Sequence, residues 1–598
     1  MRNVLHIIKN TARMLGYVLK FAPMYFIAMT VFCIYVSAVD TLSGAVAVRY
    51  IFNLLQGGTD FRTVFVFLLF VTAAMFVRHI MGAYVNYLTP LAYTKIKAGI
   101  DRMISRHAVK MDLEYYESPK FYNDFVWASA QADRNVGELM NTYAVFIARA
   151  SEALFLGIVL SSIDSVNLYI MLAVILVRVV FEIRYSKKYV KMEREVKPFE
   201  RKRDYFRRVL YLADHAKELR LSDMHKTLYK RFCGAMSEIR EIYRREGRIL
   251  AVYMTVAETI TSGVLDAAIY LYLAYNAVIT RTIMFGDAAA IISSAGKFSW
   301  IFTELFMTFP QFVKYSLYTD RFNAFMETKP KIEGGRGMHL TNKNGTIELK
   351  NVSFKYTGES GMSLKNIDLT IRPYEKIAIV GYNGAGKSTL TKLLMRFYDV
   401  SEGGIYYDGV NIKEYDLKEY RNNFGAVFQD YKIFAGSVAE NVVMDRAVSR
   451  EGIWESIEQS GLGEKVVGLK NGIDTQLTKE FYEDGTNLSG GEEQKLAISR
   501  IFYKDCGMII LDEPSSALDP ISEYRLNKTI LSLSQHKTVI FISHRLSTTC
   551  MADRILMMEN GEIIEEGTHA ELIAQNGKYA EMFNLQAKNY RKITQNNC

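Results

Sequence analysis

The chain has 598 residues, of which 49% are hydrophobic, and its 73 Lys and Arg against 64 Asp and Glu give a formal net charge of +9. The basic residues crowd the loops beside long apolar runs, which indicates a membrane protein rather than a nucleic-acid-binding protein. The five cysteines are scattered, without a CxxC pair or a histidine cluster, which excludes a disulfide scaffold and a zinc site. We expect reduced thiols facing the cytosol.

The first 22 residues alternate apolar and basic side chains at helical spacing, and no cleavable signal pattern is present. Residues 1–22 are therefore predicted to form an amphipathic helix that lies in the membrane interface and stays attached.

Six apolar stretches in the first half approach the roughly 20 residues that a membrane span needs. Together they predict an α-helical transmembrane domain over residues 23–318. Its six spans are predicted at about 24–48, 64–87, 143–162, 166–181, 249–274 and 284–309.

The basic residues also predict the orientation of these spans. The connections 88–142 and 182–248 are rich in Lys and Arg, whereas the connection 161–165 has none. By the positive-inside rule, both termini and the two long connections lie in the cytoplasm.

The two long connections keep helical periodicity over 186–212 and 225–247, which predicts helices that continue into the cytosol. We place their turning points near 112–119 and near 213–220. Short helices there would rest on the second domain and transmit its motion; ordinary solvated turns are the open alternative.

Ionisable residues inside the predicted spans usually face a bundle interior or a wet cavity. Arg149 and Glu152 are three apart on one helix, which favours a structural ion pair. Lys297 and Glu304 share one face of the sixth span and, with Glu258, line a substrate cavity or form internal salt bridges. The remaining such residues are Asp40, Arg78, Arg178 and Asp266.

Residues 319–344 form a charged, glycine-containing stretch predicted as a linker. Residues 345–585 then read as a soluble α/β domain, followed by a tail over 586–598. Within that domain, residues 381–388 fit the pattern G-x-x-x-x-G-K-[ST] between a β-branched strand and a helix. The residues of this phosphate loop and the one after it are Gly381, Tyr382, Asn383, Gly384, Ala385, Gly386, Lys387, Ser388 and Thr389.

The loop has the chemistry of a nucleotide triphosphate site. Its backbone N–H groups and the following helix N-terminus attract phosphate. Lys387 is predicted to reach the β- and γ-phosphates, and the Ser388 hydroxyl to bind Mg²⁺.

Five further signals accompany the loop. Tyr356 precedes it and offers a ring that could stack on adenine. Gln429 offers an amide suited to Mg²⁺ and the attacking water. The run 508–513 is a buried strand that ends in Asp512, for the Mg²⁺ shell, and Glu513, to polarise water. The last two signals are Ser489, Gly490 and Gly491 before an amphipathic helix, and His544 at the end of another buried strand.

This set, in this order, closely resembles the nucleotide-binding domain of ATP-binding cassette (ABC) transporters. The resemblance adds Asp519, in the position of the D-loop aspartate of 516–519. Because six spans precede the cassette, the whole chain resembles an exporter-type half-transporter, with a helical membrane domain ahead of an α/β P-loop ATPase.

The resemblance implies two chains, each ATP lying between one chain's phosphate loop and the other chain's Ser489, Gly490 and Gly491. The partner is a second copy or a related chain; ATP and Mg²⁺ are the cofactors, and the bilayer and a transported substrate the other partners. Since Glu513 and His544 are both present, this chain's own site is expected to hydrolyse ATP.

The sequence departs from the family pattern at two places. Glu492 stands where glutamine is commoner, and 479–485 only partly matches the exporter pattern. The segment 479–485, with residues 112–119 and 428–431, is similar to bacterial peptide and lantibiotic exporters, which suggests peptide export across a bacterial plasma membrane. A lipid flippase, a multidrug pump and a siderophore importer of the same fold stay open. No N-terminal peptidase domain is recognised, so leader cleavage is not expected.

Overall fold

The computed structural model describes residues 2–57, 61–212, 215–280, 282–332, 334, 337–358, 361–444, 448–514, 519–533, 536–543 and 549–585. The chain divides into two compact units. The first combines Met1–Lys110 with Pro119–Thr328, and the second combines Met111–Ser118 with Lys329–Cys598. The short segment Met111–Ser118 thus packs with the second unit, although it interrupts the first along the chain.

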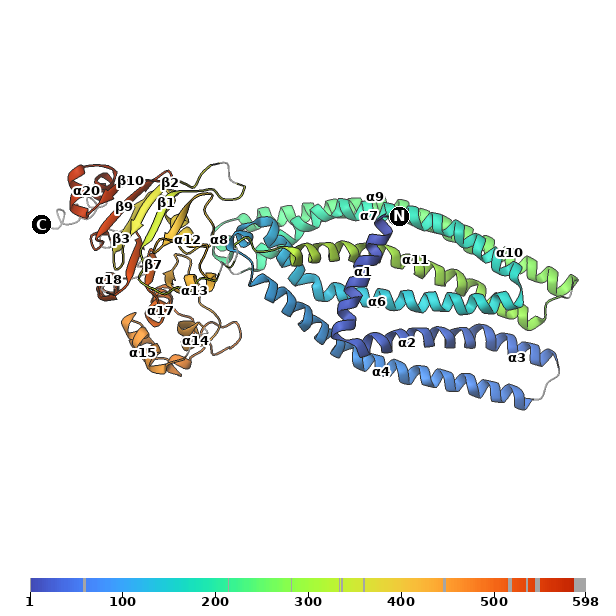
Figure 1. Ribbon diagram of the computed structural model, residues 1–598. Coiled ribbons are helices and arrows are strands. Elements are labelled where there is room, and N and C mark those ends of the chain that lie inside the picture. Colours follow the sequence, from blue (N-terminus) through green and yellow to red (C-terminus); the bar gives the residue numbers. More distant parts are fainter. Residues whose placement is uncertain are drawn as a thin grey trace. The chain divides into compact units, whose positions relative to one another are not determined.

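The first unit is made of long helices (Figure 1). These are α1 (Arg2–Phe21), α2 (Pro23–Thr41), α3 (Ala47–Gln56), α4 (Phe61–Ala108), α6 (Pro119–Ile163), α7 (Ser165–Tyr211), α8 (Ala216–Leu221), α9 (Met224–Glu258), α10 (Val264–Ala274) and α11 (Phe285–Glu327). Three π-helical segments join some of them: η1 (Leu42–Val46), η3 (Thr259–Gly263) and η4 (Tyr275–Ile279).

Four stretches of described helix are long and apolar enough to cross a membrane: Pro23–Gln56, Phe61–Ala108, Val136–Ile163 and Ser165–Tyr211. They contain the first four predicted spans. The fifth predicted span runs through α9, η3 and α10, and the sixth lies in α11; their crossing of the membrane stays a prediction. Because α11 continues to Glu327, residues 319–327 of the predicted linker are helical.

Polar bonds join α2 and α6 within the apolar bundle. The Ser37 hydroxyl donates to the carbonyl of Ala148 at 2.6 Å, and the Ser151 hydroxyl lies 3.0 Å from the Ser37 hydroxyl. Small residues let two helices approach closely, and their hydroxyls then hydrogen-bond across the interface.

The predicted ion pair on α6 is confirmed, and it belongs to a larger network. Arg149 binds Glu152 at 2.5 Å and also pairs with Glu304 on α11. Lys297, also on α11, binds the other oxygen of Glu152 at 2.8 Å. Of the two interpretations of Lys297 and Glu304, these contacts favour internal salt bridges.

The π-helical segment η1 faces α11 through its backbone. The Lys297 ammonium donates to the carbonyl of Asp40 at 3.1 Å, just before η1, and the Ser293 hydroxyl donates to the carbonyl of Gly44 at 3.4 Å. A π-helical turn changes which backbone carbonyls accept hydrogen bonds within the helix. The carbonyls that lose their partner in the helix can accept hydrogen bonds from side chains of a neighbouring helix.

The second unit holds two sheets (Figure 1). An antiparallel sheet has the order β2-β1-β4-β5, and a larger sheet has the order β10-β9-β3-β8-β7-β6. The strands are β1 (Ile347–Phe354), β2 (Leu364–Ile371), β3 (Lys376–Gly381), β4 (Glu402–Tyr407), β5 (Val410–Asn411), β6 (Phe424–Val427), β7 (Met508–Asp512), β8 (Thr538–Ile542), β9 (Arg554–Glu559) and β10 (Glu562–Gly567).

Helices accompany these sheets in the second unit. They are α5 (Leu113–Glu117), α12 (Lys387–Leu394), α13 (Leu417–Asn422), α14 (Val438–Val443), α15 (Arg450–Gln459), α16 (Gly463–Val467), the 3-10 turn η5 (Gly472–Asp474), α17 (Gly490–Tyr503), α18 (Pro520–Leu533) and α20 (His569–Gln575). Leu113 of α5 packs against the core between the sheets and α12. A short helix at the first predicted turning point therefore rests on this unit, as expected. At the second turning point the chain forms α8.

The parallel part of the large sheet brings three strand ends to one edge. Strands β3, β8 and β7 are neighbours in parallel register, with Asp512 paired to Ile542 and Ile379 paired to Ile542. Their interiors are buried Ile, Val, Leu and Phe side chains, as both faces of a parallel sheet require. Ligands of such sheets bind beyond the carboxyl ends of the strands.

Candidate functional site

The phosphate loop follows β3 and has a left-handed backbone at Gly381, Gly384 and Gly386, of which the first and last also lack space for a side chain. Gly381 has φ 149° and Gly386 has φ 102°. A Cβ at Gly381 would lie 2.3 Å from the carbonyl oxygen of Met558, and one at Gly386 would lie 2.7 Å from Leu364. Both the backbone angle and the lack of space therefore exclude larger residues.

Lys387 is the first residue of α12 and reaches back over the loop. Its ammonium donates to the carbonyls of Gly381 at 2.9 Å and Tyr382 at 3.0 Å. Burial lowers the pKa of this ammonium, although the nearby carboxylates of Asp512 and Glu513 oppose that shift. A cation held among loop carbonyls suits the binding of a phosphate oxygen.

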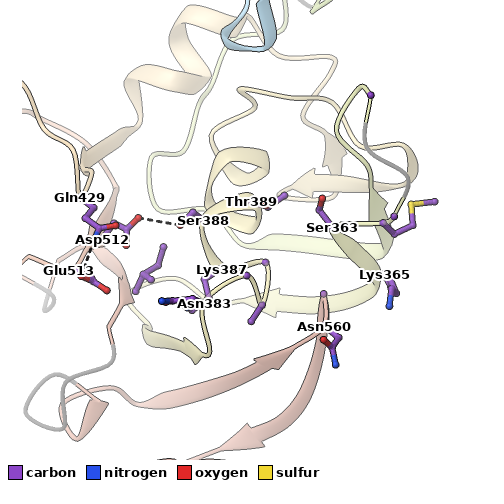
Figure 2. A pocket seen from close by; sticks show the side chains of 18 residues that line it. Ser363, Lys365, Asn383, Lys387, Ser388, Thr389, Gln429, Asp512, Glu513 and Asn560 are labelled. Carbon is purple, nitrogen blue, oxygen red and sulfur yellow. Dashed lines mark hydrogen bonds between the residues drawn. The ribbon is translucent and has the colours of Figure 1, made fainter. Parts of the chain in front are cut away.

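Ser388 and Asp512 converge from neighbouring elements. The Ser388 hydroxyl donates to Oδ2 of Asp512 at 3.4 Å, as Figure 2 shows. Burial raises the pKa of Asp512, the charge of Glu513 raises it further, and Ser388 and Lys387 lower it. The predicted meeting of the loop hydroxyl with the strand-end carboxylate is thus observed.

Glu513 follows β7 with a left-handed backbone, φ 50°, which is uncommon for a residue with a side chain. Its carboxylate accepts a hydrogen bond from the Gln429 amide at 3.3 Å, and its carbonyl accepts one from the Gln494 amide of α17, also at 3.3 Å. The bend turns the Glu513 side chain toward Gln429 beside Asp512 (Figure 2).

These groups surround one cavity of about 1020 Å³. Its lining includes most of the residues predicted for the nucleotide and the metal. They are Asn383, Gly384, Ala385, Gly386, Lys387, Ser388, Thr389, Gln429, Asp512 and Glu513.

The lining also contains residues that the sequence analysis missed. They come from the segment that leads into β2 and the start of that strand, the end of β8 and the β9–β10 turn: Gly358, Gly361, Met362, Ser363, Lys365, Ile542, Asn560 and Gly561. Ser363, Lys365 and Asn560 are labelled in Figure 2. The pair Asn560-Gly561 signals a hairpin turn, with Asn560 at φ 51°. Nothing in that signal indicates that the turn lies beside the phosphate loop.

The residues present fit a magnesium nucleotide. No group of three or more metal-ligating His, Cys, Asp or Glu exists within the described ranges. Mg²⁺ in nucleotide sites takes one or two protein ligands and completes its shell with water and phosphate. Ser388 and Asp512 meet that need, and Gln429 lines the same cavity.

Tyr356 lies in an aromatic cluster beside α12. Its ring meets the rings of Phe354 and Tyr398 edge to face, at 4.9 and 5.3 Å between centroids. Its hydroxyl lies 3.1 Å from the Thr389 hydroxyl. Tyr356 is not among the described lining residues of the cavity, so its role toward a base stays a prediction.

Hydrogen bonds and an ion pair hold the glycine-rich segment at the start of α17 in place. The Ser489 N–H donates to the Glu492 carboxylate at 2.8 Å, and Lys465 binds the other oxygen of Glu492 at 3.0 Å. The Tyr431 hydroxyl donates to the carbonyl of Gly490 at 2.9 Å. The unusual Glu492 thus closes a capping box and carries its own counter-ion.

The structure describes only part of the predicted D-loop and does not describe the predicted histidine of the site. His544 and Ser516–Leu518 lie outside the described residues. Asp519 is described, and its carboxylate accepts hydrogen bonds from the N–H groups of Ile521 and Ser522, both at 3.0 Å, at the start of α18. A hydrogen bond from the Ser522 side chain, together with these N–H bonds, lowers the pKa of Asp519.

Comparisons with known proteins agree with this geometry. Residues 364–516 match the family model described as ABC transporter. The chain is 39% identical over 260 residues to an ATP-dependent lipid A-core flippase of Burkholderia pseudomallei. It is 41% identical over 245 residues to a putative multidrug export ATP-binding/permease protein of Staphylococcus aureus. The first match covers 43% of each chain, so it spans less than half the length of that relative.

A solved structure extends the likeness to nearly the whole chain. A bacterial Atm1-family ABC exporter with ATP bound superposes with a TM-score of 0.76, covering 95% of this chain and 99% of that one, at 19% sequence identity. At that identity the match concerns the fold. The chain therefore carries a nucleotide-binding ABC transporter ATPase domain behind a helical domain with the fold of an ABC exporter.

Proposed function

We propose that the protein is an ATP-hydrolysing exporter that moves an amphipathic substrate, such as a peptide, outward across a bacterial plasma membrane by alternating access. The observation that carries the proposal is the convergence of Lys387, Ser388, Asp512 and Glu513 on one cavity, in a chain that also holds long apolar helices. Both termini and the ATPase domain face the cytoplasm in this proposal.

Each side chain has one task in hydrolysis. Lys387 and the loop N–H groups bind the phosphates and stabilise the charge that builds up during transfer. Ser388 and Asp512 would hold Mg²⁺, which would supply positive charge to the phosphates when bound. Glu513 orients and polarises the attacking water, and Gln429 fixes the direction of the Glu513 carboxylate. His544 is proposed to hydrogen-bond the γ-phosphate.

The working unit is proposed to be a dimer, formed with a second copy or with a related chain. In support, Ser489, Gly490 and Gly491 are absent from the described lining of the cavity, although they have the form of a phosphate-binding helix start. Glycines so arranged are available to a nucleotide held by another chain. Asp519 would lie at the same dimer interface.

The test is ATPase activity of the purified chain in liposomes with a panel of peptides, lipids and drugs. We expect basal hydrolysis that a peptide stimulates, and loss of both basal and stimulated activity in Glu513→Gln. Stimulation by lipids alone would favour a flippase, and stimulation by drugs alone a multidrug pump. Hydrolysis unaffected by Glu513→Gln would contradict the proposed site.

A further inference from the structure

Helix α5, which joins α4 to α6 along the chain, touches the aromatic cluster around Tyr356 through its last residue. The Glu117 carboxylate binds the Lys392 ammonium at 2.7 Å through one oxygen, and it accepts a hydrogen bond from the Tyr398 hydroxyl through the other. Lys392 and Tyr398 both lie against Tyr356. The Lys392 ammonium lies 5.6 Å from the centroid of the Tyr356 ring, and the Tyr398 ring packs against it edge to face.

A second carboxylate of α5 holds the chain on the other side of Tyr356. Glu114 accepts a hydrogen bond from the hydroxyl of Thr357, the residue directly after Tyr356, and binds the Lys331 ammonium at 2.6 Å. Asp112, just before α5, accepts hydrogen bonds from the N–H groups of Lys331 and Ile332. The helix is thus fixed to this unit at several points around one tyrosine.

The electrostatics of these contacts support a firm attachment. Burial works against the charge of Lys392, but the hydrogen bond and charge of Glu117 together with the contacts to Tyr356 outweigh it, and they raise the pKa of Lys392. Burial and the Glu117 carboxylate both raise the pKa of Tyr398. At neutral pH, Glu117 therefore meets a cation and a neutral donor, and neither neighbour repels it.

We infer that Glu117, with Glu114, positions Tyr356 for stacking on the base of the bound nucleotide, so that nucleotide affinity depends on α5. The inference rests on the proposed function, in which Tyr356 is the base platform. The Tyr356 ring packs perpendicular to the Tyr398 ring and lies against the Lys392 ammonium, and these two contacts restrict its rotation. Without Glu117, Lys392 and Tyr398 both lose the carboxylate that holds them in place. The Tyr356 ring can then rotate more freely, and it binds a base less tightly because stacking has to restrict that rotation.

The side chains at the phosphate end of the site are held by other bonds. Lys387 and Ser388 are held by the loop carbonyls and by Asp512, not by α5. A probe that carries phosphates without a base, inorganic tripolyphosphate, therefore separates the two ends of the site.

The experiment measures ATPase kinetics of the full chain in liposomes for Glu117→Ala, Tyr356→Ala and the double variant. We expect Tyr356→Ala to raise the KM for ATP on the order of tenfold. Glu117→Ala should raise it by about threefold to tenfold with kcat within about twofold. The double variant should match Tyr356→Ala, because Glu117 acts through the tyrosine. Inhibition by tripolyphosphate should be unchanged in all three.

A second test variant and a control variant complete the experiment. Thr357→Val removes only the bond to Glu114 and should raise the KM in the same direction without disturbing α5. Glu348→Ala removes a carboxylate that pairs with Lys350 on β1, and it should behave as wild type.

The inference fails if Glu117→Ala has the wild-type KM, if the two KM effects multiply in the double variant, or if tripolyphosphate inhibition weakens together with the KM. A wild-type KM in Tyr356→Ala would instead refute the base platform of the proposed function itself.

Discussion

The amide of Gln429 and the carboxylate of Glu513 face each other at 3.3 Å, each just beyond the end of one of the neighbouring strands β6 and β7. A neutral donor beside a carboxylate fixes the carboxylate's direction without changing its charge. Any movement of the Gln429 loop therefore redirects the group that is proposed to polarise water.

Replacing Glu513 with glutamine should abolish hydrolysis while leaving binding intact. The side chain keeps its size but loses its charge, and a positioned general base contributes about 10²- to 10⁴-fold to rate. We expect steady-state ATPase activity to fall by that range and ATP binding to be unchanged, because the loop and Lys387 are untouched. The exposed Glu451→Gln is the matched control, and a loss below tenfold would argue against Glu513 as the base.

Gly507 should not tolerate a side chain. A Cβ there would lie 1.8 Å from the carbonyl oxygen of Lys343, a backbone atom that cannot turn aside. We expect Gly507→Ala to destabilise the ATPase domain by about 1–3 kcal/mol, measured as a lower Tm of the purified chain.

Gly468 provides the control for that variant. A Cβ there would meet its nearest atom at 3.5 Å, an ordinary contact at an exposed helix end. Gly468→Ala should therefore leave the Tm unchanged, and an equal loss of Tm in both variants would show that the close approach does not decide the effect.

The ion pair between Glu492 and Lys465 should make stability depend on pH. Burial alone would raise the pKa of Glu492, but bonds from Ser489 and Lys465 lower it below the usual value of 4.5 for a glutamate. A carboxyl with a lowered folded pKa binds fewer protons when folded. It therefore stabilises the fold above its unfolded pKa, and that contribution is lost as pH falls through the folded pKa.

The corresponding variant is Glu492→Gln, which keeps the cap and removes the charge. Wild type should be more stable than the variant at pH 7, by less than ~1 kcal/mol because the pair is partly exposed. The difference in Tm should shrink below pH 4.5 and vanish under the folded pKa. Lys465→Met should reproduce the same pH profile, whereas a difference that grows on acidification would contradict the ion pair.

Within the helical unit, Glu152 should matter more for stability than Glu304. The Glu152 side chain is 2% exposed and serves both Arg149 and Lys297, whereas Glu304 is 29% exposed and pairs with Arg149. Glu152→Gln leaves Lys297 without its carboxylate and should cost about 1–3 kcal/mol. Glu304→Gln should cost less than ~1 kcal/mol. Thermal unfolding in detergent measures both.

The same variants address the cavity interpretation. If Glu304 is only a salt-bridge partner, Glu304→Gln should lower basal and substrate-stimulated ATPase activity by the same factor. A selective loss of stimulation would show contact with substrate.

The parts of the fold and of the candidate site that could be predicted are those encoded by short sequence motifs. The phosphate loop, Asp512 and Glu513 each follow a short buried strand, and parallel strands deliver such ends to one edge. Their convergence therefore follows from the pattern. The pair Arg149 and Glu152 was predictable for the same reason, because three residues along a helix fix the geometry.

Contacts between distant segments could not be predicted in this way. Nothing in the sequence around Lys465 indicates that it pairs with Glu492. The sequence at Asn560 predicts a hairpin turn but not its position beside the phosphate loop. The charged residues after 318 predict a linker over 319–344, whereas the helix that holds the sixth predicted span continues to Glu327. Hydropathy reports how apolar a stretch is and not how many residues each helical turn contains. The π-helical turn η1 could therefore not be predicted from it.

The wide turn at η1 has a consequence for how the first and sixth predicted spans can evolve. Its bonds to α11 end on the carbonyls of Asp40 and Gly44, and every residue type offers a carbonyl. Substitutions at positions 40 and 44 leave these acceptors in place. At these two contacts the side chains that matter are therefore Ser293 and Lys297 of α11, whereas the facing helix contributes only backbone carbonyls. Its sequence is constrained elsewhere, by the Ser37 bond to α6 and by the ion pair of Asp40 with Arg78.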